Sequence, residues 1–294
     1  VSTQSTWGEP KNLTAAATQK CTLGCPVLDR FLGGGVPCSS VTELVSESGC
    51  GKTQISLQLL LAAQLPVSLG GLAASSIFIH SEFPFPSRRL HHLSQSFRFS
   101  RPRHHGDGDP CDRIFVRGVH SAGQLLDVLS QTDSLLSRLP PPSVRLIVID
   151  SIAALFRAEF DNTPRDLRRR SSLFFKIAGL LKSLALRLAA AVVVTNQVVD
   201  AVGEGEVRIG EPGRLYSSGR RVCPALGISW ANCVNSRVFL SRSDRAVGGE
   251  DGELVETQTR RRLHVVFAPH LPCSSCEFVI RRDGVFGVET SGDG

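Results

Sequence analysis

A chain of 294 residues that is 41% hydrophobic and 20% charged has an ordinary globular composition, with room for one large α/β domain or two small ones. No apolar run approaches the roughly 20 residues of a membrane-spanning helix, so we expect no membrane partner. The net charge of +6 is carried almost entirely by arginine, and it favours a polyanionic partner only weakly.

The cysteine content points to an intracellular protein. The nine cysteines are an odd number, and residues 1–20 lack the apolar segment of a secretory signal. Reduced thiols in the nucleus or cytosol are therefore the simpler expectation. A four-cysteine zinc site is the alternative, and it is disfavoured because neither close pair lies in a compact ribbon-like segment. Its ligands would be Cys21, Cys25, Cys273 and Cys276.

Short apolar segments alternate with segments of helical periodicity between residues 26 and 195. The expected strands are Val41–Val45, Ile77–His80, Arg113–Val116, Arg145–Asp150 and Ala191–Thr195. The expected helices are Pro26–Leu32, Lys52–Leu65, Ser121–Leu139 and Asp166–Ala190. This alternation predicts an α/β fold with a mostly parallel, twisted sheet covered by helices on both faces.

The ends of the chain differ from this central pattern. Residues 1–20 lack apolar periodicity and are expected to form a flexible linker or interaction arm, residues 21–290 the core, and residues 291–294 a tail. Residues 203–219 are polar and rich in glycine, and we expect them to be mobile. The last strands are separated by loops, which predicts an antiparallel C-terminal extension of the same sheet. They are Arg237–Leu240, Leu263–Phe267 and Glu277–Arg281.

A phosphate-binding loop of the Walker A type is predicted at Ser46–Thr53, between an expected strand and an expected helix. Gly49 and Gly51 allow backbone N–H groups to turn toward phosphates, at the positive end of the following helix. Lys52 would reach the β and γ oxygens of ATP, and Thr53 would bind magnesium. Serine replaces the usual first glycine of the motif. This replacement is tolerated if the backbone at that position has a negative φ.

Three strand ends supply the remaining candidates. Asp150 ends an apolar strand, as a Walker B carboxylate that holds magnesium does, although it could instead cap the next helix. Glu82 could polarise the attacking water, and Gln197 could hydrogen-bond the γ-phosphate; a solvated glutamate and a structural strand cap are the alternatives. The residues expected at the nucleotide are Gly49, Cys50, Gly51, Lys52, Thr53 and Asp150, with Glu82 and Gln197 in catalysis.

These motifs together resemble the RecA/recombinase family of P-loop ATPases. The helix after the phosphate loop, the segment Phe83–Leu90 and the strand end Thr195–Val199 are similar to those of eukaryotic recombinases. Three further segments resemble a recombinase paralogue: Leu23–Asp29, Pro224–Asn232 and Ala268–Cys276. The resemblance implies a RecA-like core that binds ATP and magnesium. It also implies a nuclear protein, present also in the cytoplasm, that repairs double-strand breaks and crosslinks by homologous recombination.

Two loops face DNA in this family. The first corresponds to Arg157–Arg170, where five arginines stand against three acidic residues, and it is expected to contact phosphates of single-stranded or branched DNA. The second, Val198–Val222, balances four arginines with four acidic residues, and so predicts no basic groove. Solvated loops are the alternative for both. The arginines expected at DNA are Arg157, Arg165, Arg168, Arg169 and Arg170.

The chain also departs from the filament-forming members. Only residues 1–20 precede the expected core, where the family often has an N-terminal helical domain, and Leu13–Ala16 only weakly resembles the family's polymerisation hook. Phe267–Pro269 stands where recombinases place an acidic residue that caps a neighbour's ATP. The resemblance therefore implies a complex with a sister paralogue, or with the recombinase itself, rather than a self-assembled filament.

Three functions remain open from the sequence. The favoured one is an ATP-dependent recombination mediator with a weak, DNA-stimulated ATPase activity. The second is a self-assembling strand-exchange ATPase, and the third is a scaffold that uses ATP only to stabilise its fold.

Overall fold

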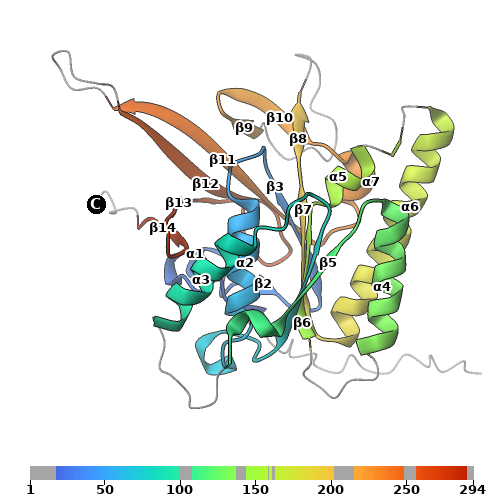
Figure 1. Ribbon diagram of the computed structural model, residues 1–294. Helices are drawn as coiled ribbons and strands as arrows, with labels where there is room; N and C mark the ends of the chain where they lie inside the picture. The colour runs from blue at the N-terminus through green and yellow to red at the C-terminus, as the bar shows by residue number, and fades with distance from the viewer. Residues whose placement is uncertain are drawn as a thin grey trace, which may run out of the picture.

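The computed structural model describes residues 18–99, 108–136, 144–157, 159–160, 163–201, 215–247 and 256–289 (Figure 1). A nine-stranded sheet runs through the molecule, in the order β14-β13-β12-β11-β3-β7-β6-β4-β5. Every neighbouring pair from β11 to β5 is parallel, and β11 to β14 are antiparallel. Both the mostly parallel sheet and its antiparallel C-terminal extension are confirmed.

The strands of this sheet have the following bounds. The parallel part holds β3 (Ser40–Val45), β4 (Ser75–His80), β5 (Ile114–Gly118), β6 (Val144–Asp150) and β7 (Ala191–Asn196). The antiparallel part holds β11 (Ser236–Val247), β12 (Glu256–Phe267), β13 (Ser275–Ile280) and β14 (Val285–Gly287). A separate two-stranded sheet pairs β1 (Lys20–Cys21) with β2 (Val36–Pro37).

Helices cover both faces of the large sheet (Figure 1). One face packs against α1 (Pro26–Phe31), α2 (Lys52–Ala62) and α3 (Ser87–Phe99). The other packs against α4 (Ala122–Leu136), α5 (Ile152–Arg157), α6 (Pro164–Arg187) and α7 (Gly227–Ala231). Two short 3₁₀ helices, η1 (Val67–Leu69) and η2 (Pro110–Arg113), complete the described helices. Helices α3, α5 and α7 were not predicted.

The central strands are apolar throughout because each one faces two cores. In β6, Leu146 and Val148 pack in the core beneath α2, whereas Ile147 and Ile149 pack in the core beneath α6. Side chains alternate between the faces of a strand, so a strand covered on both sides needs an unbroken apolar run. The parallel arrangement brings the carboxyl ends of β3, β4, β6 and β7 to one edge, where the polar candidates lie.

A second sheet replaces much of the loop expected at Val198–Val222. Strand β10 (Arg220–Pro224) pairs antiparallel with β8 (Val198–Asp200) and with β9 (Leu215–Ser217). Val222, buried beside Phe239 and Val266, ties this small sheet to the large one. The alternative of a solvated loop is wrong for these three strands, because their backbone groups pair with one another. Residues 203–214 of the segment expected to be mobile lie outside the described residues.

Two further expectations can be set against the structure. Among the described helices, none is long and apolar enough to cross a membrane. No disulfide joins any of the nine cysteines, all of which lie in the described part of the chain. The weak hook at residues 13–16 lies outside the described residues.

Candidate nucleotide site and DNA-facing surface

The predicted phosphate loop lies between β3 and α2, as its motif requires. Gly49 has a φ of 81° and Gly51 a φ of 115°, which only glycine adopts without strain. A Cβ on Gly51 would also lie 2.8 Å from the Ile280 side chain. Ser46 does not adopt a positive φ, so serine is accommodated at this position. The loop therefore places its N–H groups at the start of α2, where an anion is favoured.

Lys52 folds back onto this loop. Its ammonium donates to the carbonyl oxygen of Ser46 at 2.8 Å, to the Ser46 hydroxyl at 3.0 Å and to the carbonyl oxygen of Glu47 at 3.1 Å. Burial lowers the pKa of Lys52 below its ordinary value, and the nearby carboxylates of Asp150 and Glu82 oppose that shift. Two backbone carbonyls thus hold the Lys52 ammonium, which is the one cation of the loop. A bound phosphate would compete with these carbonyls for the ammonium.

The Cys50 side chain points toward Glu47 and Ser217. Its thiol lies 3.9 Å from Oε1 of Glu47 and 3.8 Å from the Ser217 hydroxyl, and burial raises its pKa. The backbone N–H of Cys50 is therefore the group that this residue can offer to a phosphate.

Thr53 and Asp150 form the predicted magnesium pair. The Thr53 hydroxyl donates to Oδ2 of Asp150 at 2.7 Å. The other carboxylate oxygen accepts a hydrogen bond from the Thr195 hydroxyl at 2.6 Å, which orients the carboxylate. Sequence reasoning missed Thr195, although its position two residues before Gln197, on the same strand end, could have indicated it. Hydroxyl and carboxylate oxygens suit magnesium, so this donor set fits the ion.

Glu82 and Gln197 lie side by side at the exposed rim. The Gln197 amide nitrogen donates to Oε1 of Glu82 at 2.7 Å, and the Gln197 oxygen accepts a hydrogen bond from Arg157. The structure thus brings together the buried Lys52 and the partly buried Asp150 with Glu82 and Gln197 at the surface. Arg157 joins them as the first residue of the expected DNA-facing segment.

The other expected DNA contacts lie on a helix and not in a loop. Helix α6 begins at Pro164, because the Thr163 hydroxyl caps it by accepting the Asp166 N–H at 3.1 Å. Arg165, Arg168 and Arg169 are exposed on its first turns. The prediction of a loop extending to residue 170 was therefore wrong.

Arg170 differs from its neighbours on α6. Its guanidinium lies 5.2 Å from the centroid of the Phe174 ring and donates to the carbonyl oxygen of Ala225 at 3.3 Å. Burial lowers its pKa. Arg170 therefore holds α6 against the segment before α7, and it is directed away from the surface that the exposed arginines share.

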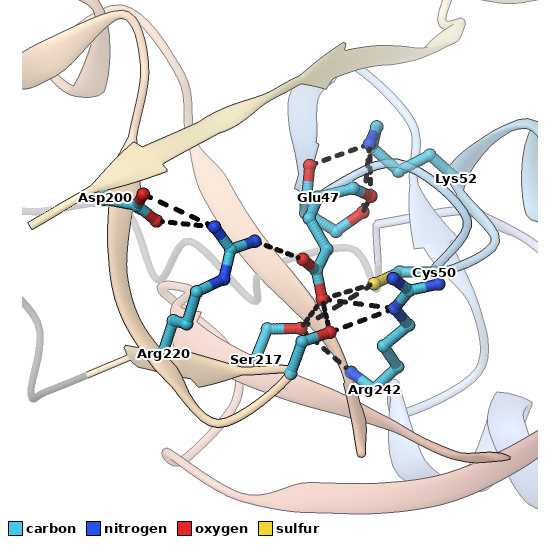
Figure 2. Close-up of polar contacts among 9 residues, drawn as sticks. Glu47, Cys50, Lys52, Asp200, Ser217, Arg220 and Arg242 are labelled. Atoms are coloured by element: carbon cyan, nitrogen blue, oxygen red, sulfur yellow. Dashed lines mark hydrogen bonds and ion pairs between the residues drawn. The ribbon is translucent and has the colours of Figure 1, made fainter. Parts of the chain in front are cut away.

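Glu47 anchors a second polar cluster, which joins the phosphate loop to the small sheet (Figure 2). Its carboxylate accepts hydrogen bonds from Ser217 at 2.6 Å, from Ser218, and from Arg220 at 3.1 Å. Arg242 lies 3.3 Å from the same carboxylate. This cluster was not predicted. Its members come from three separate segments, and no spacing relates them.

A pocket of about 470 Å³ lies between the Glu47 cluster and the hydrogen-bonded pair Arg157 and Gln197. Glu47 and Ser48 of the phosphate loop line one side, and Arg157 and Gln197 line another. Arg220, together with residues 198–200 of β8, completes the lining. The pocket thus connects the phosphate loop with both segments that were expected to face DNA.

Elsewhere, the described residues contain one further group of metal-ligating types, at the start of η2. Ligand atoms of His91, Asp109 and Cys111 lie within 4.8 Å of one another. Oδ1 of Asp109 accepts the Cys111 N–H at 2.9 Å, so the aspartate already serves as the cap of η2. The four cysteines Cys21, Cys25, Cys273 and Cys276 do not form such a group.

Known proteins share much of this sequence. The Rad51 family profile matches residues 16–217. The DNA repair protein XRCC3 homolog of Arabidopsis thaliana is 51% identical over 300 residues, which cover 96% of this chain and 98% of that protein. DNA repair protein XRCC3 of Bos taurus is 39% identical, over 92% of this chain and 75% of its own length. DNA repair protein RAD51 homolog 2 of Mus musculus is 31% identical, over 88% of this chain and 72% of its own length. The predicted resemblance to recombinases and their paralogues is confirmed, and the chain belongs to the Rad51 family.

Proposed function

We propose that this chain is an ATP-dependent recombinase paralogue that acts in the repair of DNA by homologous recombination. The names of its relatives support a repair role, because both XRCC3 proteins and RAD51 homolog 2 are DNA repair proteins. The observation that carries the proposal is the hydrogen-bonded series Glu82–Gln197–Arg157, which joins the nucleotide site to the predicted DNA-facing surface. A repair protein of this kind would work in the nucleus.

ATP would be held by the backbone of the phosphate loop, by the helix α2 N-terminus and by Lys52. Thr53 and Asp150 would hold magnesium, which neutralises charge on the phosphate oxygens. Lys52 would exchange its carbonyl partners for phosphate oxygens, and Thr195 would keep the Asp150 carboxylate oriented. These residues bind and position the nucleotide, and none of them needs to move a proton.

Glu82 and Gln197 would control turnover. One oxygen of the Glu82 carboxylate is occupied, because it accepts the hydrogen bond from the Gln197 amide. This contact would hold Glu82 away from an attacking water. A γ-phosphate that draws the Gln197 amide toward it would compete with Glu82 and Arg157 for that side chain. Weak hydrolysis, faster when DNA takes Arg157, follows from this arrangement.

DNA would bind along the exposed arginines. Arg165, Arg168 and Arg169 lie exposed on the first turns of α6, and Arg157 ends α5 at the pocket. Their guanidinium groups can pair with phosphates, and a contact of this kind carries no sequence preference.

A sister paralogue is the proposed partner, and the edge of the large sheet offers it a surface. Strand β5 is the last described strand at this side of the sheet, so no strand in the described part of the chain pairs with one row of its backbone groups. Phe115 on this strand is 55% exposed and Val116 is 41% exposed. An extended apolar segment could add to such an edge by strand pairing.

Calorimetric titration with ATP and magnesium tests the proposal, with hydrolysis measured with and without single-stranded DNA. Binding should be lost in Lys52→Ala, and Glu82→Gln should bind ATP but not hydrolyse it. If the wild-type chain, alone and with its sister paralogue, releases no heat with ATP at any magnesium level, the proposal is wrong.

A further inference from the structure

Glu47 occupies the second position of the phosphate loop and has two separate sets of partners. Its backbone carbonyl accepts the Lys52 ammonium at 3.1 Å. Its carboxylate accepts the hydroxyl of Ser217, at 2.6 Å, and the guanidinium of Arg220, at 3.1 Å (Figure 2). The residue therefore connects the cation that would meet the nucleotide with the turn between β9 and β10.

The carboxylate itself is not available to a nucleotide. Glu47 is 9% exposed. Its carboxylate is surrounded by hydrogen-bond donors and cations, namely Ser217, Ser218, Arg220 and Arg242. Burial acts to raise the pKa of Glu47, but the hydrogen bonds and charges of these four residues outweigh burial and lower the pKa. The ionised carboxylate repels phosphate, and its oxygens already accept from Ser217, Ser218 and Arg220, so Glu47 acts on the nucleotide through the backbone of its loop.

Arg220 extends the connection to a second strand. One of its nitrogens donates to Oε2 of Glu47, and the other donates to Oδ1 of Asp200 at 3.0 Å. Asp200 ends β8, and that strand begins at the residue after Gln197. The small sheet is thus attached to the nucleotide site twice, covalently at Gln197 and through an ion pair at Glu47.

We propose that Glu47 is a positioning residue through which the phosphate loop and the β8–β10–β9 sheet report on each other's state. When Lys52 turns to phosphate oxygens it releases the Glu47 carbonyl, and the loop then shifts at the residue whose side chain holds the β9–β10 turn. The inference rests on the proposed ATP site and adds a second connection, independent of Gln197, between that site and the sheet.

The fold can tolerate the loss of this contact. Ser218 also donates its backbone N–H to the Arg242 carbonyl at 2.8 Å, so the turn keeps its place on β11 without Glu47. Glu47→Gln retains one oxygen that can accept the serine hydroxyls, and it replaces the charged oxygen that accepts Arg220 with an N–H donor, so it breaks the ion pair. Changes in nucleotide response can therefore be separated from unfolding, which thermal melting of each variant would monitor.

A double-mutant cycle on ATP affinity tests the proposal. We expect Glu47→Gln and Arg220→Gln each to weaken ATP binding about fivefold, and the double variant to bind no more weakly than either one. The partly buried ion pair of Arg260 with Glu277, 3.8 Å apart on β12 and β13, is the matched control. Arg260→Gln and Glu277→Gln should leave ATP affinity unchanged, singly and together.

Hydrogen exchange of residues 215–224, with and without a slowly hydrolysed ATP analogue, is the second readout. In the wild-type chain, the exchange rates of residues 215–224 should change when the nucleotide binds. In Glu47→Gln at saturating nucleotide, most of this change should be lost. Additive losses in the cycle, or an unchanged exchange response in Glu47→Gln, would overturn the inference. If the wild-type chain binds ATP without any response in residues 215–224, this inference fails alone; if it binds no ATP, the proposed function fails too.

Discussion

The hydroxyl of Ser46 accepts a hydrogen bond from the Lys52 ammonium at 3.0 Å, at the position where the phosphate-loop motif usually has glycine. A glycine would leave that ammonium with its two carbonyl partners alone. Ser46 therefore adds an acceptor that a phosphate must displace. Because hydrogen bonds to charged groups contribute about 1.5–3 kcal/mol, this extra partner is large enough to alter nucleotide affinity.

Removal of the Ser46 hydroxyl should tighten ATP binding. We expect Ser46→Gly and Ser46→Ala each to lower the dissociation constant up to about tenfold, since Lys52 would have one partner fewer to give up. Alanine is compatible with the backbone here because Ser46 does not adopt a positive φ. Calorimetry at saturating magnesium measures the change, and unchanged or weaker binding in both variants would contradict the role of the hydroxyl.

Thr195 should govern the magnesium dependence of binding. Thr195→Val removes the hydrogen bond to Oδ1 of Asp150, and we expect the magnesium concentration for half-maximal ATP binding to rise roughly five- to tenfold. Thr42→Val on the neighbouring strand β3 is the matched control, because the buried Thr42 hydroxyl has no hydrogen-bond partner among the described residues. The prediction fails if both variants show the same magnesium titration as the wild-type chain.

The arginines at the start of α6 should differ in their effect on DNA. Arg165→Ala and Arg168→Ala should weaken binding to single-stranded DNA and lower its salt slope by about 0.7 each. Arg170→Ala should leave the slope unchanged and lower the melting temperature, because Arg170 is directed toward Phe174 and Ala225. Fluorescence anisotropy across a salt series separates the two groups. Equal slopes in all three variants would argue against this helix as the contact.

The pH dependence of stability should include a contribution from His264. Burial and the positive charge of Arg262 lower the pKa of His264, and the ring is hydrogen-bonded to Ser241 at 2.8 Å and packed beside Phe239. The unfolded chain therefore binds a proton near the ordinary value of 6.5, whereas the folded chain resists it. Stability should fall as the pH drops below that value.

Urea denaturation of the wild-type chain and of His264→Gln at pH 7.5 and 5.5 measures this contribution. The variant should lose less stability between the two pH values than the wild-type chain. The wild-type chain has to be compared with the variant because burial and Lys20 also lower the pKa of His270, which both proteins contain. Identical losses in the two proteins would assign the pH dependence to other groups.

Much of the fold was predictable from local patterns, and the exceptions have physical causes. The strands ending at Asp150 and Asn196 were indicated by apolar runs, because a strand buried on both faces has few polar positions. Helix α6 began earlier than predicted, since the cap is Thr163 and the helix includes Pro164. Strands β9 and β10 were missed because their short polar segments are stabilised by pairing with each other, which no periodicity reveals.

The phosphate loop and the polar residues at the strand ends could be recognised without coordinates. Their roles depend on neighbours close in the chain and on the rule that parallel strands end at one edge. The contacts of Arg157 with Gln197 and of Glu47 with Ser217 join residues 40 and 170 positions apart, and they became visible only in the folded chain. Side-chain contacts over such separations follow from how strands and turns pack in three dimensions, so a single sequence carries no local signal for them.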